Sequence, residues 1–227
     1  MKPAEFVDLL CVAFENITHN TALHFREALR FGGRKWWWKL NFLIWISYLH
    51  DPPYRVIPRF LRSHDIPEDN LIYGETPLVT VEKFLEFLKP GPCDVFIDLG
   101  CGRGLPVFYT HMLSGVISRG IDIVPDFIER AAAVSSRLSL DRVSFACSSF
   151  SEADISDGTL FYMAGTTFDD GLVCELTEKL EEIAHPVRLI TLSAPLASAH
   201  FRLVTKMELD FSWGKTWAFF QQSRDDA

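Results

Sequence analysis

The main feature of the chain from residue 73 onward is an alternation of short apolar runs with stretches of helical period. The run Asp94–Leu99 (DVFIDL) predicts a buried strand, and 106–113 predicts the helix after it. The further predicted strands are 116–123, 142–147, 159–163 and 187–193, and the further predicted helices are 126–137 and 172–184. Because strands that alternate with helices pair in parallel, the pattern indicates an α/β fold with helices on both faces of the sheet.

The last two apolar runs break this alternation. Residues 203–209 and 216–221 both read as strands, and no helical stretch separates them. Strands joined by a short turn pair antiparallel, so we expect an edge hairpin on an otherwise parallel sheet.

The first 72 residues have a different texture. Phe6, Leu10, Phe14 and Ile17 recur at helical spacing, and a second helix is predicted over 21–31, closed by Gly32-Gly33. We therefore divide the chain into a helical extension or lid (1–72), a main domain (73–222) and a short tail (223–227).

The extension contains a run that is apolar nearly all round. Trp36-Trp37-Trp38 is followed by Leu40–Leu49, and Asp51-Pro52-Pro53 ends the run. It is shorter than the ~20 apolar residues of a membrane span and contains Lys39. We expect a helix buried between the extension and the main domain. The alternatives are an element on a membrane surface and the wall or lid of an apolar pocket.

The overall charge limits the classes of partner. The 227 residues carry a formal net charge of -8, so a broadly basic nucleic-acid surface is not expected. The five cysteines are widely spaced and form no metal-binding motif, which is typical of reduced thiols and predicts no metal site. We expect a cytoplasmic protein without a transmembrane segment or a secretory signal.

The strongest local motif is Asp98-Leu-Gly-Cys-Gly-Arg-Gly104, between a predicted strand and a predicted helix. Glycines at 100, 102 and 104 let the backbone turn tightly and approach a ligand closely. Asp122 ends the next strand, where a carboxylate can accept hydrogen bonds from both hydroxyls of a ribose. The acid before the glycines suits the cationic amino-acid end of S-adenosylmethionine (SAM), and the glycine spacing disfavours NAD.

These two segments resemble motifs I and II of the class I SAM-dependent methyltransferases. The resemblance covers roughly residues 70–222 and implies SAM as cofactor, S-adenosylhomocysteine (SAH) as product, and a Rossmann-like seven-stranded sheet whose last strand is antiparallel. It implies cofactor contacts from Asp98, the three glycines, Asp122 and the following Ile123.

A finer resemblance begins with Tyr73-Gly-Glu-Thr76, about twenty residues before the glycine motif. The same element is found in the non-SET histone-lysine methyltransferases, the disruptor-of-telomeric-silencing family. There it folds over the methionine end of SAM. The resemblance implies that Tyr73, Glu75 and Thr76 contact the cofactor, with Glu75 paired to its ammonium group.

Later segments match that family only in part. Ser149-Phe150 corresponds to its adenine-binding Asp-Phe, with Ser149 in place of the acid. Ala164-Gly-Thr-Thr-Phe168 corresponds to an Asn-Asn-Phe-x-Phe element, so Ala164 replaces an Asn beside the reacting centre. Ser212-Trp-Gly-Lys resembles its last hairpin. Cofactor contacts are implied for Ser149, Phe150 and Ala164, and acceptor contacts are expected from Thr166, Phe168 and Trp213.

Three functions fit these patterns. The first is methylation of a protein lysine or another amine, from the Tyr-Gly-Glu-Thr element. The second is methylation of a small or apolar molecule, from the aromatic extension. The third is SAM binding without catalysis, because the Asn is lost and no general base stands out. We assign no catalytic residue, and His111, His185 and His200 remain unassigned candidates.

Overall fold

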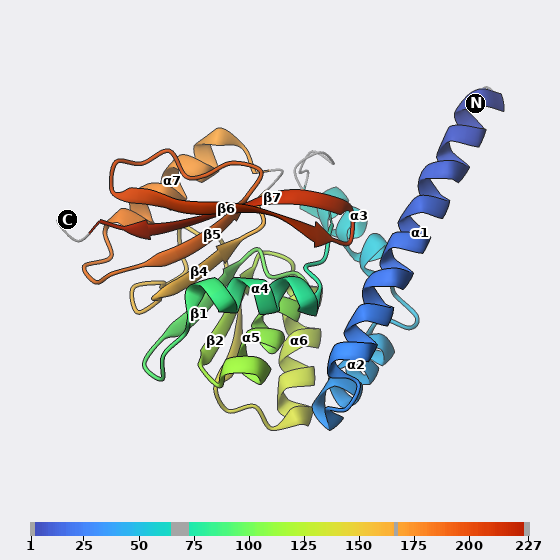
Figure 1. Ribbon diagram of the computed structural model, residues 1–227, viewed down its shortest axis with the longest axis horizontal. Coiled ribbons are helices and arrows are strands. Elements are labelled where there is room, and N and C mark those ends of the chain that lie inside the picture. Colours follow the sequence, from blue (N-terminus) through green and yellow to red (C-terminus); the bar gives the residue numbers. More distant parts are fainter. Residues whose placement is uncertain (1–2, 65–72, 166–167, 225–227) are drawn as a thin grey trace.

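A seven-stranded sheet forms the centre of the molecule (Figure 1). The computed structural model describes residues 3–64, 73–165 and 168–224. The strands are β1 (Val95–Leu99), β2 (Ile117–Asp122), β3 (Val143–Cys147), β4 (Leu160–Met163), β5 (Arg188–Leu192), β6 (Phe201–Phe211) and β7 (Gly214–Ser223), in the order β3-β2-β1-β4-β5-β7-β6. Strand β7 runs antiparallel to both of its neighbours, whereas β1 to β5 pair in parallel. The predicted mostly parallel sheet with a terminal hairpin is confirmed.

Helices cover both faces of this sheet. On one face lie α4 (Leu78–Leu88), α5 (Leu105–Ser114) and α6 (Pro125–Leu138), and on the other lies α7 (Asp170–Glu181). Side chains alternate along each strand, so Phe96 of β1 packs toward α4 while Ile97 packs toward α7. All five residues of β1 are buried, because a central parallel strand has a helix layer on each side.

The helix boundaries follow local signals in the sequence. Gly104 adopts φ 78° at the N-cap of α5, and a proline occupies the first turn of both α5 and α6, where its missing N–H has no partner to lose. The Asp169 side chain caps α7 by accepting from the Leu172 N–H at 2.9 Å. These helices and strands lie close to the predicted ranges.

The extension forms three helices: α1 (Pro3–Phe31), α2 (Lys35–Ser47) and α3 (Pro53–His64). The prediction of two helices before Gly32 is wrong, since α1 is continuous through residues 18–21. Thr18, Asn20 and Thr21 donate their side-chain hydrogen bonds to backbone carbonyls three or four residues earlier, which leaves the helix intact. The prolines expected only to end a helix also begin one, because Pro53 starts α3.

Helix α2 is buried on one side only. Trp37, Leu40 and Ile44 are buried, and α2 packs against α6. On the opposite side Trp38 and Phe42 are more than half exposed. The expectation of a helix buried between the extension and the main domain holds for the side that faces α6 and is wrong for the outer side, over which no described element packs.

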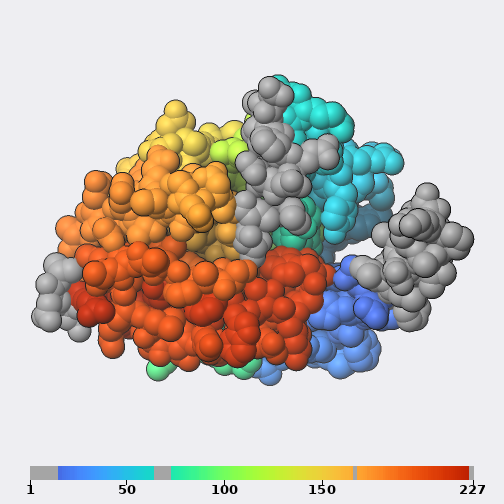
Figure 2. Space-filling model, turned by 90° about the horizontal axis from the view of Figure 1, so that it is seen from above, coloured from blue at the N-terminus to red at the C-terminus, as the bar shows by residue number. Residues whose placement is uncertain are grey.

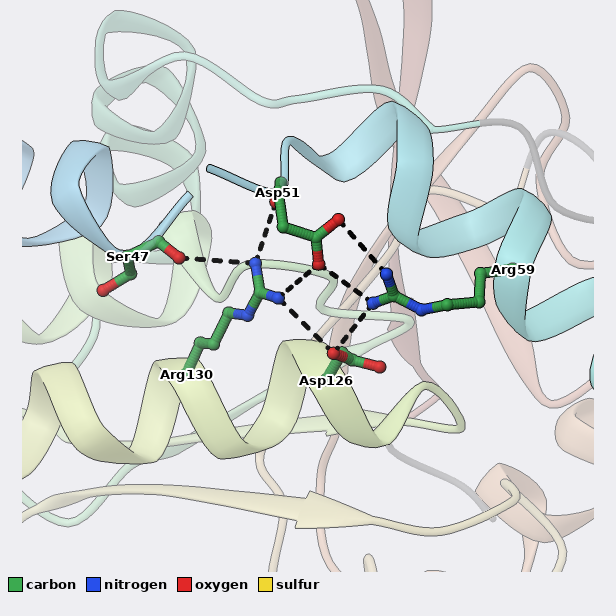
Figure 3. A network of polar contacts seen from close by, with 5 residues as sticks. All are labelled: Ser47, Asp51, Arg59, Asp126 and Arg130. Atoms are coloured by element: carbon green, nitrogen blue, oxygen red, sulfur yellow. Dashed lines mark hydrogen bonds and ion pairs between the residues drawn. The ribbon is translucent and has the colours of Figure 1, made fainter. Parts of the chain in front are cut away.

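A charged network joins the end of α2 and the start of α3 to α6 (Figure 3). Asp51 lies between two guanidinium groups and accepts from Arg130 at 2.6 Å and from Arg59 at 2.9 Å. Arg130 also donates to the Ser47 and Asp51 carbonyls, and both arginines reach Asp126. Arg59 and Arg130 lower the pKa of Asp51 to about 2.

Helix α1 lies beside the tip of the β6–β7 hairpin, and its N-terminal half projects beyond the body (Figure 1). In Figure 2 the hairpin, in red, adjoins the blue end of the extension. His19 and Asn20 are hydrogen-bonded to the carbonyls of Phe211 and Ser212, at 2.7 and 2.9 Å, and Arg26 pairs with Asp210 at 2.7 Å. The extension is thus fixed to both the hairpin and α6.

Candidate cofactor and acceptor site

A cavity of about 450 Å³ opens at the carboxyl ends of β1 and β4. This edge of a parallel sheet is where ligands bind in doubly wound α/β folds. Ten of the predicted site residues line it: Tyr73, Glu75, Thr76, Asp98, Gly100, Gly102, Asp122, Ala164, Phe168 and Trp213. Thr166 lies outside the described residues. Segments far apart in the sequence therefore meet at one cavity.

The glycine loop forms the floor of the cavity. The N–H groups of Gly100 and Cys101 both donate to the Ile121 carbonyl, at 2.9 and 3.0 Å, which holds the loop against β2. Gly100 and Gly102 adopt φ 85° and 50°, a left-handed region that side-chain-bearing residues rarely occupy. Glycine at these positions permits the tight turn from β1 into α5.

Asp98 places a buried carboxyl group without a hydrogen-bond partner on the cavity wall. Its side chain is 1% exposed, and its Oδ2 atom has no hydrogen-bond partner among the described residues. Burial raises the pKa of Asp98 well above its ordinary value, and the nearby Asp122 carboxylate raises it further. A cationic ligand would favour the ionised form and supply the missing partner.

Asp122 holds the loop from the other side. Its Oδ2 accepts from the Gly102 N–H at 2.8 Å, and its Oδ1 accepts from the Val124 N–H at 2.9 Å. Burial raises the pKa of Asp122, and the backbone N–H groups of Val124, Gly102 and Ile123 oppose that rise. Each oxygen keeps a second lone pair, so the carboxylate can still accept from a ligand hydroxyl.

Glu75 is already paired. Its carboxylate forms an ion pair with Arg103 and accepts a hydrogen bond from the Tyr73 hydroxyl. The Arg103 guanidinium lies 5.1 Å from the centre of the Tyr48 ring, a cation–π contact that joins the loop to α2. Glu75 is expected from the sequence to be the partner of the ligand ammonium, yet it already has a cation, whereas the Oδ2 atom of Asp98 has no partner among the described residues.

The Tyr73–Thr76 segment is fastened to the terminal hairpin. The Glu75 N–H donates to the Ser212 hydroxyl at 2.7 Å, and the Ser212 N–H donates to the Glu75 carbonyl at 3.0 Å. Gly74 lies under the Trp213 ring, so closely that a Cβ atom there would come within 2.2 Å of it. A glycine is required because the indole occupies the space of a side chain.

Thr76 does not cap a helix. Its hydroxyl is hydrogen-bonded to the buried Tyr162 hydroxyl at 2.6 Å, while Thr80 donates to the Asp210 carbonyl. The N-cap of α4 is Pro77 and has no side-chain cap. Both threonine hydroxyls therefore hold the Tyr73–Thr76 segment and α4 against the sheet rather than cap the helix.

A second, smaller pocket of about 180 Å³ adjoins the first. The two share Tyr73, Glu75 and Arg103, and the extension and the hairpin complete the second with Asn20, Pro53, Tyr54 and Ser212. Its lining combines polar groups of Asn20, Glu75, Arg103 and Ser212 with apolar surface. Within the described residues, none from the aromatic run 36–48 lines either pocket, so the structure does not support the alternative in which this run walls the site.

Several solved structures have a fold similar to that of this chain. An RNA methyltransferase from Salinibacter ruber, solved with SAH, matches with TM-score 0.57 and 23% identity over 67% of this chain and 95% of that one. TrmN from Thermus thermophilus matches with TM-score 0.56 and 12% identity over 69% of this chain and 52% of that one. The geranyl diphosphate C-methyltransferase from Streptomyces coelicolor A3(2) matches with TM-score 0.53 and 14% identity over 64% and 75%.

The chain has the class I methyltransferase fold. These identities support the fold and leave the acceptor open, since the neighbours are named for RNA and for a terpenoid diphosphate. The chain spans about half the length of the Thermus protein. No family model and no curated protein matches the sequence.

Four predicted cofactor residues are not among those that line the cavity. Gly104 caps α5, and Ile123 packs partly buried against the core beside α6. The Ser149 hydroxyl is bonded to Ser151 and Glu152. Phe150 is buried and packs on Phe168, with ring centres 5.3 Å apart. Their predicted contacts with the cofactor remain predictions.

Sequence reasoning missed other residues of the cavity. Arg103 stood inside the glycine motif, and its charge was the available signal. Tyr162 and Ser193 follow from the structure: Tyr162 neighbours Asp98 across β1 and β4, and Ser193 lines the cavity just after β5 with φ 67°. A residue other than glycine with a positive φ has a strained backbone, and strained residues cluster at functional sites.

Proposed function

We propose that the protein is a SAM-dependent methyltransferase, and the observation that carries this is the unpartnered carboxylate of Asp98. A buried acid without a partner is destabilising unless a ligand supplies a donor. The α-ammonium of SAM is such a donor, and its ribose hydroxyls suit the free lone pairs of Asp122. The residues present thus fit this cofactor.

The chain's own residues then position the two ends of the cofactor. Asp98 binds the ammonium, and Arg103 offers a cation to the carboxylate of the same amino-acid end. Asp122 orients the ribose, because its own position is fixed by two backbone donors. When bound, SAM supplies an electrophilic methyl group, and transfer requires an acceptor lone pair held in line with it.

We propose an extended polar acceptor, such as the amine of a protein lysine, that enters through the second pocket. That pocket is small, at about 180 Å³, and its polar lining groups come from Asn20, Glu75, Arg103 and Ser212. Oxygen atoms of Asn20, Glu75 and Ser212 can accept hydrogen bonds from an amine, whereas the carbon chain of a terpenoid would leave them unpaired. The aromatic residues of α2, which favoured a small apolar acceptor, line neither pocket.

The first test is calorimetric titration of the purified protein with SAM and with SAH. We expect micromolar affinity, about -8 kcal/mol, and its loss in Asp122→Ala. Absence of binding to both ligands would sink the proposal. Transfer is then measured with labelled SAM on protein substrates and on a small-molecule extract. SAM binding without transfer to either would indicate a non-catalytic SAM-binding protein.

The acceptor route is tested separately with Tyr54→Ala. Tyr54 lies at the second pocket and outside the first. We expect a higher KM for the acceptor and an unchanged Kd for SAM. Arg55→Ala, an exposed neighbour on the same helix, is the matched control. Equal effects of the two substitutions would contradict this route.

A further inference from the structure

The outer side of α2 presents an unusual apolar surface. Trp38, Phe42 and Trp45 are 58%, 56% and 57% exposed, and Ile46 and Leu49 are exposed beside them. We call these five residues the outer face of α2. Spacings of four and three residues place Trp38, Phe42 and Trp45 on one side of the helix, with Ile46 beside them and Leu49 just beyond the helix end. Buried Trp37, Leu40 and Ile44 hold the other side against the body.

This surface is ordered rather than frayed. The Trp38 indole N–H donates to the Gly32 carbonyl at 2.7 Å, and the rings of Phe42 and Trp45 lie 6.2 Å apart. At its C-terminal end, α2 is fixed to α6 through the Arg130 contacts with Ser47 and Asp51 (Figure 3). Contiguous exposed apolar surface of this kind is typical of sites that bind a partner or a membrane.

Helix α1 adds further exposed apolar side chains to this part of the surface. Phe25 and Leu29, in its last two turns, are strongly exposed. A short turn at Gly32-Gly33 joins α1 to α2. The exposed apolar residues thus belong to two consecutive helices of the extension.

The charge around the outer face is opposite to that of the whole chain. Residues 28–50 contain Arg30, Arg34, Lys35 and Lys39 and no acidic residue, whereas the chain has a net charge of -8. Arg30 pairs with Glu82. The other three are exposed, and no ion pair joins them to an acid among the described residues. A partner for this surface must therefore be both apolar and anionic.

We propose that the outer face of α2 is a docking site for an anionic lipid bilayer surface. Tryptophan and phenylalanine beside lysine and arginine are the composition of helices that lie in the membrane interface, where the rings enter the acyl boundary and the cations meet the head groups. This inference does not rest on the methyltransferase assignment.

The geometry favours lying on the bilayer rather than crossing it. The 13 residues of α2 span about 20 Å, against ~30 Å for the hydrocarbon core. No helix in the described part of the chain has the length and apolarity of a membrane span. A second copy of the chain is a poorer occupant, because a two-fold contact through this face would bring Lys35 and Lys39 near their own counterparts.

The test is co-sedimentation of the full chain with vesicles of phosphatidylcholine alone and of phosphatidylcholine with phosphatidylglycerol. We expect binding to the anionic vesicles that weakens with added salt and is much weaker on the neutral ones. The double variant Phe42→Ser/Trp45→Ser is expected to bind at least about ten-fold more weakly. Lys35→Gln/Lys39→Gln is expected to lose about five-fold per charge removed.

The matched control is Leu203→Ser/Trp217→Ser, which replaces two exposed apolar residues of the β6–β7 hairpin. It should bind the anionic vesicles like the unaltered protein. Thermal unfolding of every variant checks that the fold is kept. The proposal is overturned if the chain does not bind anionic vesicles, or if the control loses binding as much as the α2 variants. It is equally overturned if the α2 substitutions instead convert a dimer to a monomer.

Discussion

Replacement of Asp98 by Asn tests the assignment of the cofactor site most directly. The substitution keeps the shape of the side chain and removes its charge. A charge-assisted hydrogen bond contributes about 1.5–3 kcal/mol, so the Kd for SAM should rise about 10- to 150-fold. SAH carries the same ammonium group without the sulfonium charge. A similar loss for both ligands would therefore locate the contact at the amino-acid end.

The same substitution should stabilise the protein without ligand. The pKa of Asp98 is raised in the folded state by burial and by Asp122. Its contribution to stability is therefore fully present below the unfolded pKa, about 3.9, and is lost as the pH rises through the folded pKa. Asn cannot ionise, so at neutral pH Asp98→Asn should unfold at a higher temperature than the unaltered protein.

Binding of SAM should also release a proton from the protein. The ammonium favours the ionised carboxylate, so SAM binding below the raised pKa should release a proton from Asp98. Calorimetry in buffers of different ionisation enthalpy measures this release, which Asp98→Asn should abolish. Asp154→Asn, an exposed acid outside the cavity, is the control. Unchanged SAM affinity in Asp98→Asn would refute the reasoning.

Two other substitutions test the framework around the site. Gly74→Ala places a methyl group where the Trp213 ring lies, so we expect weaker SAM binding in calorimetry. The additional substitution Trp213→Ala removes the ring and should restore part of the affinity. Unchanged SAM binding in Gly74→Ala would mean that the segment shifts to make room. Asp51→Asn removes the carboxylate shared by Arg59 and Arg130 and should lower the free energy of unfolding at neutral pH by about 1 kcal/mol. The pKa of Asp51 is lowered to about 2, so this difference in stability should be present above about pH 4 and vanish as the pH falls toward 2. Thermal unfolding at a series of pH values measures it. A stability difference that persists in acid would contradict the pairing of Asp51 with the two arginines.

Much of the fold follows from the sequence because its signals are local. The run Asp94–Leu99, the turn glycines and the proline starts of α5 and α6 depend on a few neighbouring residues. Their succession suffices for a parallel sheet, since strand–helix alternation admits few topologies. The glycine motif and Asp122 were placed at one sheet edge for the same reason.

The extension was predicted less well because its outcome depends on what packs against it. The sequence of 36–49 is apolar on all sides, and only the position of α6 decides that Trp37 is covered while Trp38 is exposed. In the stretch 18–21 of α1, His19 and Asn20 are hydrogen-bonded to carbonyls of the distant hairpin, a tertiary contact that residue preferences do not reveal.

The class of fold, and the glycines and acids at the carboxyl edge of the sheet, follow from the amino-acid sequence. Both depend on the order of residues over short stretches of the chain. The tertiary structure alone decided which carboxylate remains unpaired. Arg103 neutralises Glu75, while Asp98 is buried without a cation. It also decided that Ser212, 137 residues along the chain, holds Glu75. Whether two side chains pair, and whether they are buried, depends on how close they lie in space. For residues that are far apart in the sequence, that spacing is set only once the whole chain has packed.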